Sequence, residues 1–191
     1  MKTSEYFSGI INKSSLNMLI IVSGPMFAGK TTWLLEYASK LSKGTFKLYK
    51  PNIDSRYADD KCVTHDGLNM PSFNLDVENP QFINLGEKIK TIIIDELNFF
   101  NADKLIPAIY KQLKLKRTIV GAGLNYDYQK VPFGSTIPLA KIANKSISLF
   151  SICDKCRKKA HTYTGEYKMK IEFFWALQTP MEPVVKDVGV I

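Results

Sequence analysis

Short runs of consecutive apolar residues recur along the first three quarters of the chain. Such runs are typical of strands that a parallel sheet buries on both faces. They predict strands at Leu19–Ser23, Thr91–Asp95 and Thr118–Ala122, and a fourth strand is expected at Phe46–Tyr49, where Lys47 interrupts the apolar residues and Pro51 ends the strand.

Between these runs, apolar residues recur at helical spacing in Thr31–Leu41 and in Asp103–Leu113. Strands that alternate with helices require crossover connections, which join parallel strands with a right-handed turn. The pattern therefore predicts an α/β fold built on a parallel sheet.

Three segments depart from this alternation. Residues 1–15 are mostly polar, which predicts a flexible N-terminal tail. The stretch from Asn52 to Gly67 is polar and longer than an ordinary connection, which favours a functional or mobile loop. Beyond Phe150 a cysteine pair, basic residues and a weakly periodic tail follow. We therefore expect a main domain over residues 16–150 and a small appendage over residues 151–191.

The segment Gly24-Pro-Met-Phe-Ala-Gly-Lys-Thr31 matches the pattern G-x-x-x-x-G-K-[ST] and lies between a predicted strand and a predicted helix. In such a loop, backbone N–H groups and the positive end of the helix hold phosphate oxygens. A glycine turn with an incidental lysine is the alternative, which the matching context on both sides disfavours. The residues predicted to bind the phosphates of a nucleoside triphosphate are Gly24, Pro25, Met26, Phe27, Ala28, Gly29, Lys30 and Thr31.

Two acidic residues follow the third predicted strand. Asp95 stands where enzymes with a phosphate loop keep a carboxylate for Mg²⁺, and Thr31 would supply a hydroxyl ligand. Glu96 could accept a proton from an acceptor hydroxyl, which favours a kinase, although a hydrolase would also place a glutamate there. Ligands of parallel sheets bind beyond the carboxyl ends of the strands, so we expect both acids to share a crevice with the phosphate loop.

A family resemblance rests on these motifs and on others in the same order. The chain resembles the type II, cellular-type thymidine kinases over roughly residues 16 to 160. The matching segments are Gly24–Thr31, Ser55-Arg-Tyr57, Thr64-His-Asp66, Asp95-Glu-Leu-Asn-Phe-Phe100, Leu124, Pro132-Phe-Gly134 and Cys153-x-x-Cys156.

The resemblance implies transfer of a phosphoryl group from ATP, with Mg²⁺, to the 5′-hydroxyl of thymidine or deoxyuridine in nucleotide salvage. By the family pattern, Glu96 is the catalytic base and Arg56 steadies charge on the transferred group. Asn98 stands where glutamine is common in the family and is assigned to the ATP site. Its side chain is one carbon shorter, which would alter a contact to the nucleobase. Tyr128 replaces the usual phenylalanine. The resemblance assigns the nucleoside pocket to Met26, Asp54, Arg56, Phe99, Leu124, Tyr128 and Phe133.

The C-terminal part departs from the family, which closes its site with a loop held by four zinc ligands. Cys153 and Cys156 match the first pair, but Met169–Ile191 contains neither cysteine nor histidine. His161 or the pair Cys62 and His65 could complete a site of four ligands. The sequence predicts a half site for Zn²⁺ or none. Because the loop that closes the family's active site is not matched here, a degenerate family member that binds ATP without kinase activity is the alternative.

The formal net charge of +8 raises the question of a nucleic-acid partner. The basic residues are spread out, with small clusters at Lys111–Arg117 and Arg157–Lys159, which favours solvated faces and attraction of a polyanionic small molecule. A nucleic-acid-dependent ATPase would rest on charge alone. We expect neither a nucleic-acid nor a membrane partner. The chain lacks a long apolar segment near its N-terminus, which predicts a cytoplasmic location. The resemblance implies that the protein forms a homotetramer.

Overall fold

The computed structural model describes residues 18–52, 61–63, 69–83, 85–153, 156–160, 169–170 and 176–177. The predicted N-terminal tail, Asp54 and Arg56 lie outside these ranges, as do His65, His161 and most of the C-terminal tail.

The main sheet has seven strands in the order β12-β8-β1-β7-β6-β2-β5. Every neighbouring pair is parallel except β12, which runs antiparallel to β8. The strands are β1 (Leu19–Gly24), β2 (Phe46–Pro51), β5 (Phe73–Leu75), β6 (Thr91–Ile94), β7 (Thr118–Leu124), β8 (Lys145–Ser148) and β12 (Ala176–Leu177).

This sheet confirms the four predicted strands, although their ends differ from the prediction by one or two residues. The pattern missed β5, β8 and β12, which are only two to four residues long. Each of them contains at most two apolar residues, whereas β6, which is as long as β8, has three in succession, so the missed strands show no apolar run that distinguishes a strand from a loop. The predicted parallel α/β fold is confirmed.

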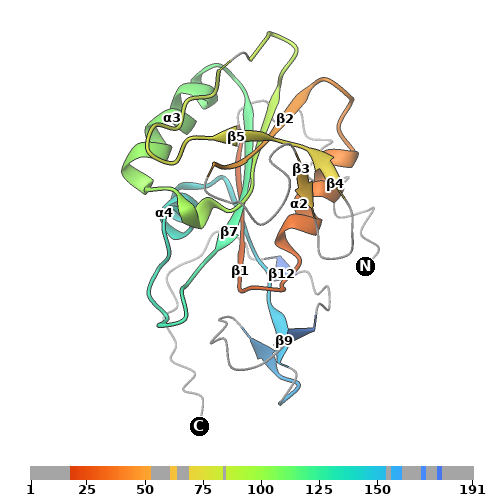
Figure 1. Cartoon of the computed structure of the whole chain (residues 1–191), viewed down its shortest axis with the longest axis vertical. Coiled ribbons are helices and arrows are strands. Elements are labelled where there is room, and N and C mark those ends of the chain that lie inside the picture. Colours follow the sequence, from red (N-terminus) through yellow and green to blue (C-terminus); the bar gives the residue numbers. More distant parts are fainter. Residues whose placement is uncertain are drawn as a thin grey trace.

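Helices cover both faces of the sheet. Helix α2 (Lys30–Ser39) packs on one face, and α3 (Ala102–Lys114) and α4 (Thr136–Ile142) pack on the other (Figure 1). A short 3₁₀ helix, η1 (Leu97–Phe99), follows β6. At the start of α3, the Asn101 side chain accepts a hydrogen bond from the Asp103 N–H at 2.8 Å, which caps the helix. None of the helices in the described part of the chain is both long and apolar enough to cross a membrane.

Alternate residues of the central strands face opposite layers. In β1, Ile20 and Val22 pack with Trp33 and Leu34 of α2, whereas Leu19 and Ile21 pack with the side of the sheet that α3 and α4 cover. Each such side chain contributes about 1.5–3 kcal/mol when it leaves water. Burial on both sides explains why these strands appear in the sequence as continuous apolar runs.

Two smaller sheets flank the main one. Strand β3 (Lys61–Val63) lies within the segment predicted to be a loop and pairs antiparallel with β4 (Asn69–Pro71). Strands β9 (Ser151–Cys153), β10 (Lys159–Ala160) and β11 (Met169–Lys170) form a sheet of three strands. Because β12 returns to the main sheet, the division at residue 150 stays a prediction.

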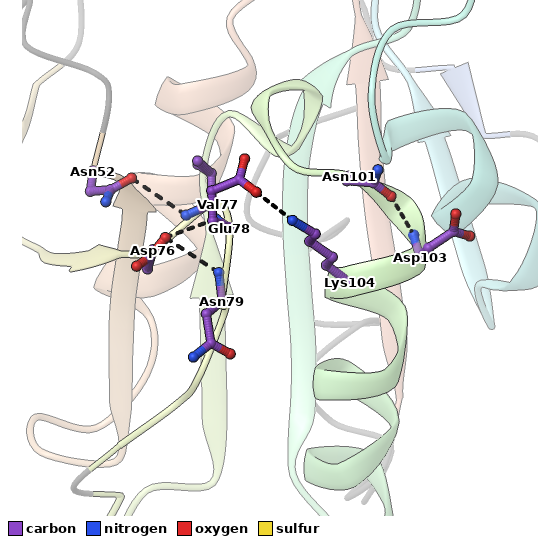
Figure 2. Close-up of polar contacts among 8 residues, drawn as sticks. All are labelled: Asn52, Asp76, Val77, Glu78, Asn79, Asn101, Asp103 and Lys104. Atoms are coloured by element: carbon purple, nitrogen blue, oxygen red, sulfur yellow. Dashed lines mark hydrogen bonds and ion pairs between the residues drawn. The ribbon is translucent and has the colours of Figure 1, made fainter.

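A polar network on the surface joins the turn after β5 to helix α3 (Figure 2). The Asp76 carboxylate accepts hydrogen bonds from the N–H groups of Glu78 and Asn79, at 2.8 and 3.3 Å. The Glu78 carboxylate in turn pairs with the Lys104 ammonium group of α3. These groups are exposed, so the network fixes the turn locally and adds little stability.

Candidate active site

The loop between β1 and α2 has the backbone shape that anion binding requires. Phe27 and Gly29 both adopt left-handed conformations, with φ of 60° and 78°. Gly29 is the N-cap of α2 and has no side chain to occupy the first N–H groups of that helix. Left-handed residues of this kind turn successive N–H groups toward a common centre, and the helix end adds positive charge. This backbone shape suits phosphate oxygens, and the assignment of the loop to phosphate binding stays a prediction.

Three contacts hold this loop in place. The Lys30 ammonium group donates to the Pro25 carbonyl oxygen at 2.7 Å and is buried, with 9% of the residue exposed. Ser151 at the start of β9 donates its hydroxyl hydrogen to the Met26 carbonyl oxygen at 2.7 Å. The Leu149 N–H donates to the Ser23 carbonyl oxygen, also at 2.7 Å. No sequence motif marks Ser151, and only its position in the fold reveals this contact.

Asp95 lies immediately beyond β6, with its carboxylate against the start of α2. The Thr31 hydroxyl donates to Asp95 Oδ2 at 2.8 Å, and the Glu96 N–H donates to Asp95 Oδ1 at 2.9 Å. The Cys62 thiol also donates to Oδ2, at 3.3 Å. Burial raises the pKa of Asp95, while these three hydrogen bonds and the nearby Lys30 charge act in the opposite direction.

Thr31 and Asp95 suit a Mg²⁺ ion. A hydroxyl and a carboxylate oxygen are hard donors, and here they lie side by side at the end of the phosphate loop. Mg²⁺ in phosphoryl-transfer sites uses one or two protein oxygens together with substrate phosphates and water. Within the described residues no group of three or more His, Cys, Asp or Glu side chains could hold a metal, so a Mg²⁺ site would need substrate oxygens as further ligands.

Glu96 occupies a left-handed conformation, with φ of 53°, between β6 and η1. For a residue with a side chain this costs on the order of 1–3 kcal/mol and persists only where neighbouring contacts hold the backbone. The Asp95 carboxylate holds the Glu96 N–H, and the Ser135 hydroxyl donates to the Leu97 carbonyl oxygen at 2.7 Å. The predicted base therefore lies half-buried on a constrained turn directly after the predicted metal ligand.

Asn98 connects η1 to the end of β7. It is 2% exposed, and its side-chain oxygen accepts a hydrogen bond from the Leu124 N–H at 2.9 Å. Its side-chain nitrogen has no hydrogen-bond partner in the part of the chain that the structure describes. The observed contact is thus to the backbone of a predicted nucleoside-pocket residue, and the predicted contact of Asn98 with ATP stays a prediction.

The segment Pro132-Phe-Gly134 packs directly against η1. Gly134 has φ of 58°, and a Cβ atom on it would lie 1.9 Å from the Asn98 carbonyl oxygen, so no residue with a side chain fits there. The rings of Phe99 and Phe133 meet edge to face, with their centroids 6.1 Å apart. The motif therefore brings two of the predicted nucleoside-pocket rings together.

The other predicted pocket residues are less enclosed. Leu124 pairs in register with Gly24, so β7 ends beside the start of the phosphate loop. Met26 and Leu124 are half-buried, whereas Tyr128 is 68% exposed. The assignment of these residues to a nucleoside pocket stays a prediction.

The cysteine pair lies at the far end of β9. Cys153 is half-buried, Cys156 is exposed, and neither forms a disulfide bond within the described residues. The Arg157 N–H donates to the Cys153 carbonyl oxygen at 2.8 Å, and the Cys153 N–H donates to the Lys158 carbonyl oxygen at 2.9 Å, so a tight turn carries the pair. Cys62, considered above as a further ligand, lies instead at Asp95. A complete zinc site is not assembled by the described residues.

The solved structures that resemble this chain include a distant one. A chain from a structure of two coordinating Pif1 helicases at forked double-stranded DNA is 14% identical, with a TM-score of 0.43. The match covers 78% of this chain and 44% of that chain. So low a score supports no conclusion about function, and the fold assignment rests on the strand order and the phosphate loop described above.

Comparison with known sequences gives a closer match. The thymidine kinases of Pyrobaculum aerophilum and Thermococcus kodakarensis are each 34% identical to this chain, over 148 and 149 residues. The matches cover 75% and 74% of this chain, and 79% and 75% of the two relatives. The thymidine kinase of Pseudothermotoga lettingae is 29% identical over 78% of this chain and 81% of its own. A family model described as thymidine kinase matches residues 17–171, and the chain therefore belongs to the thymidine kinase family.

Proposed function

We propose that this protein is a thymidine kinase, which transfers the γ-phosphoryl group of ATP to the 5′-hydroxyl of thymidine or deoxyuridine. Family membership supports the substrate class. The observation that carries the mechanism is the 2.8 Å contact between Thr31 and Asp95, because it joins the phosphate loop to the strand end that bears Glu96.

The phosphate loop binds ATP through its backbone N–H groups and the start of α2. Lys30 lies within the loop, and its ammonium group has three hydrogens, so it can bind β- and γ-phosphate oxygens as well as the Pro25 carbonyl. Thr31 and Asp95 would hold Mg²⁺, which would supply positive charge to offset the negative charge of the phosphates. This part of the reaction consists of positioning and electrostatic stabilisation.

Glu96 acts as the general base in this mechanism. As the 5′-hydroxyl oxygen forms its bond to the γ-phosphorus, the Glu96 carboxylate takes the hydroxyl proton and ADP leaves with the electrons of the broken bond. The constrained turn after β6 limits where the Glu96 side chain can reach. Arg56 steadies the charge of the transferred group by the family pattern.

The nucleoside is held between η1, the end of β7 and the segment that contains Phe133. The half-buried rings of Phe99 and Phe133 give apolar faces on which a pyrimidine base can stack. Met26, Asp54, Leu124 and Tyr128 complete the proposed pocket. We also propose ATP as the donor, a homotetrameric assembly and a cytoplasmic role in nucleotide salvage, on the basis of family membership.

A panel of acceptors tests this function. The protein is incubated with ATP labelled at the γ-phosphate, Mg²⁺ and, separately, thymidine, deoxyuridine, deoxycytidine, deoxyguanosine or 5′-deoxythymidine. We expect label on thymidine and deoxyuridine and none on 5′-deoxythymidine, which lacks the acceptor hydroxyl. Phosphorylation of a purine nucleoside with thymidine untouched would overturn the assignment.

A further inference from the structure

Cys62 lies at the centre of the β3–β4 hairpin and faces the main sheet. The residue is 5% exposed and belongs to the apolar cluster on the α2 side of that sheet. Its partner in the hairpin is Met70, which packs against the same cluster. The hairpin therefore docks on the face that also carries the phosphate loop.

The thiol of Cys62 reaches the carboxylate that would bind Mg²⁺. Its Sγ lies 3.3 Å from Asp95 Oδ2, the oxygen that also accepts the Thr31 hydroxyl hydrogen. The Glu96 N–H occupies Oδ1. Both carboxylate oxygens are thus held by donors from three segments. Thr31 belongs to the phosphate loop, Glu96 follows β6, and Cys62 belongs to the β3–β4 hairpin.

The Cys62 thiol is suited to donate rather than to react. The residue is buried within an apolar cluster, and its S–H group is directed at a carboxylate oxygen, which can only accept a hydrogen. A thiol is a weak donor, but a donor to a buried carboxylate contributes more than one to a neutral acceptor. An apolar side chain of the same size would fill the space without fixing the carboxylate.

We propose that Cys62 is a positioning residue, whose thiol holds Asp95 in the orientation that Mg²⁺ binding requires. This inference rests on the proposed function, because it assigns Asp95 to the metal of the ATP site.

The test compares three replacements of Cys62, one that keeps a hydrogen-bond donor and two that remove it. Cys62→Ser keeps an O–H group, while Cys62→Ala and Cys62→Val remove it, and Cys62→Val also keeps the volume filled. Calorimetric titration with Mg²⁺–ATP measures binding without thymidine, and initial rates give kcat and the KM for thymidine. We expect Cys62→Ala and Cys62→Val to weaken Mg²⁺–ATP binding about threefold to tenfold, with the KM for thymidine unchanged and Cys62→Ser within about twofold of the unmodified protein.

Met70→Ala is the matched control, because it removes packing from the same hairpin without touching Asp95. It should lower the melting temperature and leave Mg²⁺–ATP affinity unchanged. The inference is wrong, and Cys62 only packs, if Cys62→Ser binds Mg²⁺–ATP no better than Cys62→Ala and Cys62→Val do. The same conclusion follows if all three variants bind Mg²⁺–ATP like the unmodified protein. If Cys62→Ala does not fold, Cys62→Val and Cys62→Ser decide the question. If the unmodified protein binds no Mg²⁺–ATP, the proposed function fails, and the inference fails with it.

Discussion

The candidate site has two sides that differ in how firmly the chain holds them. The phosphate side consists of Gly24–Thr31 with Asp95 and Glu96, and the nucleoside side consists of Phe99, Leu124, Tyr128 and Phe133. On the phosphate side, Lys30 and Asp95 are buried, with 9% and 4% exposed, and both make hydrogen bonds. The nucleoside residues are half-buried or, for Tyr128, largely exposed.

This difference follows from where the residues lie in the chain. One loop supplies most of the phosphate side, a buried strand places Asp95 next to it, and hydrogen bonds from Ser151 and Cys62 hold the loop and the carboxylate. The nucleoside side draws residues from η1, the end of β7 and the segment before α4, which lie on separate elements. We therefore expect mutations on the phosphate side to change ATP binding or kcat, and mutations on the nucleoside side to change the KM for thymidine.

The largest effect is expected at Lys30. Lys30→Ala removes a buried ammonium group from the phosphate loop, which should weaken ATP binding and lower kcat by about 10²–10³-fold. Initial rates at varied ATP, together with calorimetric ATP binding, measure both losses. Lys104→Ala is the control, because that lysine pairs with Glu78 on the surface and should leave both values unchanged (Figure 2). Equal effects of the two substitutions would remove the distinction between the phosphate side and the surface.

Glu96→Gln should lower kcat by about 10²-fold or more, because the amide cannot accept the proton of the 5′-hydroxyl. ATP binding should stay nearly intact, since Lys30, Thr31 and Asp95 are unchanged. Single-turnover rates at saturating substrates separate this loss from any change in affinity. Full activity of Glu96→Gln would show that another group is the base.

On the nucleoside side, Phe133→Ala should raise the KM for thymidine about tenfold and leave the KM for ATP unchanged, because it removes a face for base stacking. Steady-state kinetics with each substrate varied in turn would measure this split. Tyr128→Phe is the comparison variant, since an exposed ring that keeps its aromatic face should change the KM less than about twofold. A rise in the KM for ATP on Phe133→Ala would mean that the two sides are not separate.

The smallest effect is expected at the cysteine pair. Cys153→Ser should leave ATP binding unchanged and lower activity less than about twofold, because structural zinc takes four ligands and no group of three or more His, Cys, Asp or Glu side chains among the described residues could hold a metal. Elemental analysis of the unmodified protein should find less than one zinc per chain. A full equivalent of zinc, lost together with activity in Cys153→Ser, would show that other residues complete the site.

The sequence predicts the phosphate side well because its constraints are local. The two glycines, Lys30 and Thr31 fall within one loop, and a continuous apolar run before Asp95 marks a strand end. For the same reason, the four predicted strands and the helices α2 and α3 could be predicted from the sequence. The central strands are buried on both faces, so their neighbouring residues are apolar.

Contacts between distant segments leave no such mark. Ser151 supports Met26 across 125 positions of sequence, and Cys62 reaches Asp95 across 33. Asn98 could be assigned only by family pattern to ATP, whereas the observed bond is to the Leu124 backbone. A polar residue that bonds to a distant backbone or carboxylate group looks, in sequence, like any other polar residue.

Thymidine-dependent release of ADP tests the central claim most directly. The protein is supplied with ATP and Mg²⁺, and ADP and thymidine monophosphate are measured with and without thymidine. The account predicts that thymidine stimulates ADP release strongly and that the two products form in equal amounts. ADP release that does not depend on thymidine, or ATP binding with no release at all, would contradict it and indicate a nucleotide-binding protein without kinase activity.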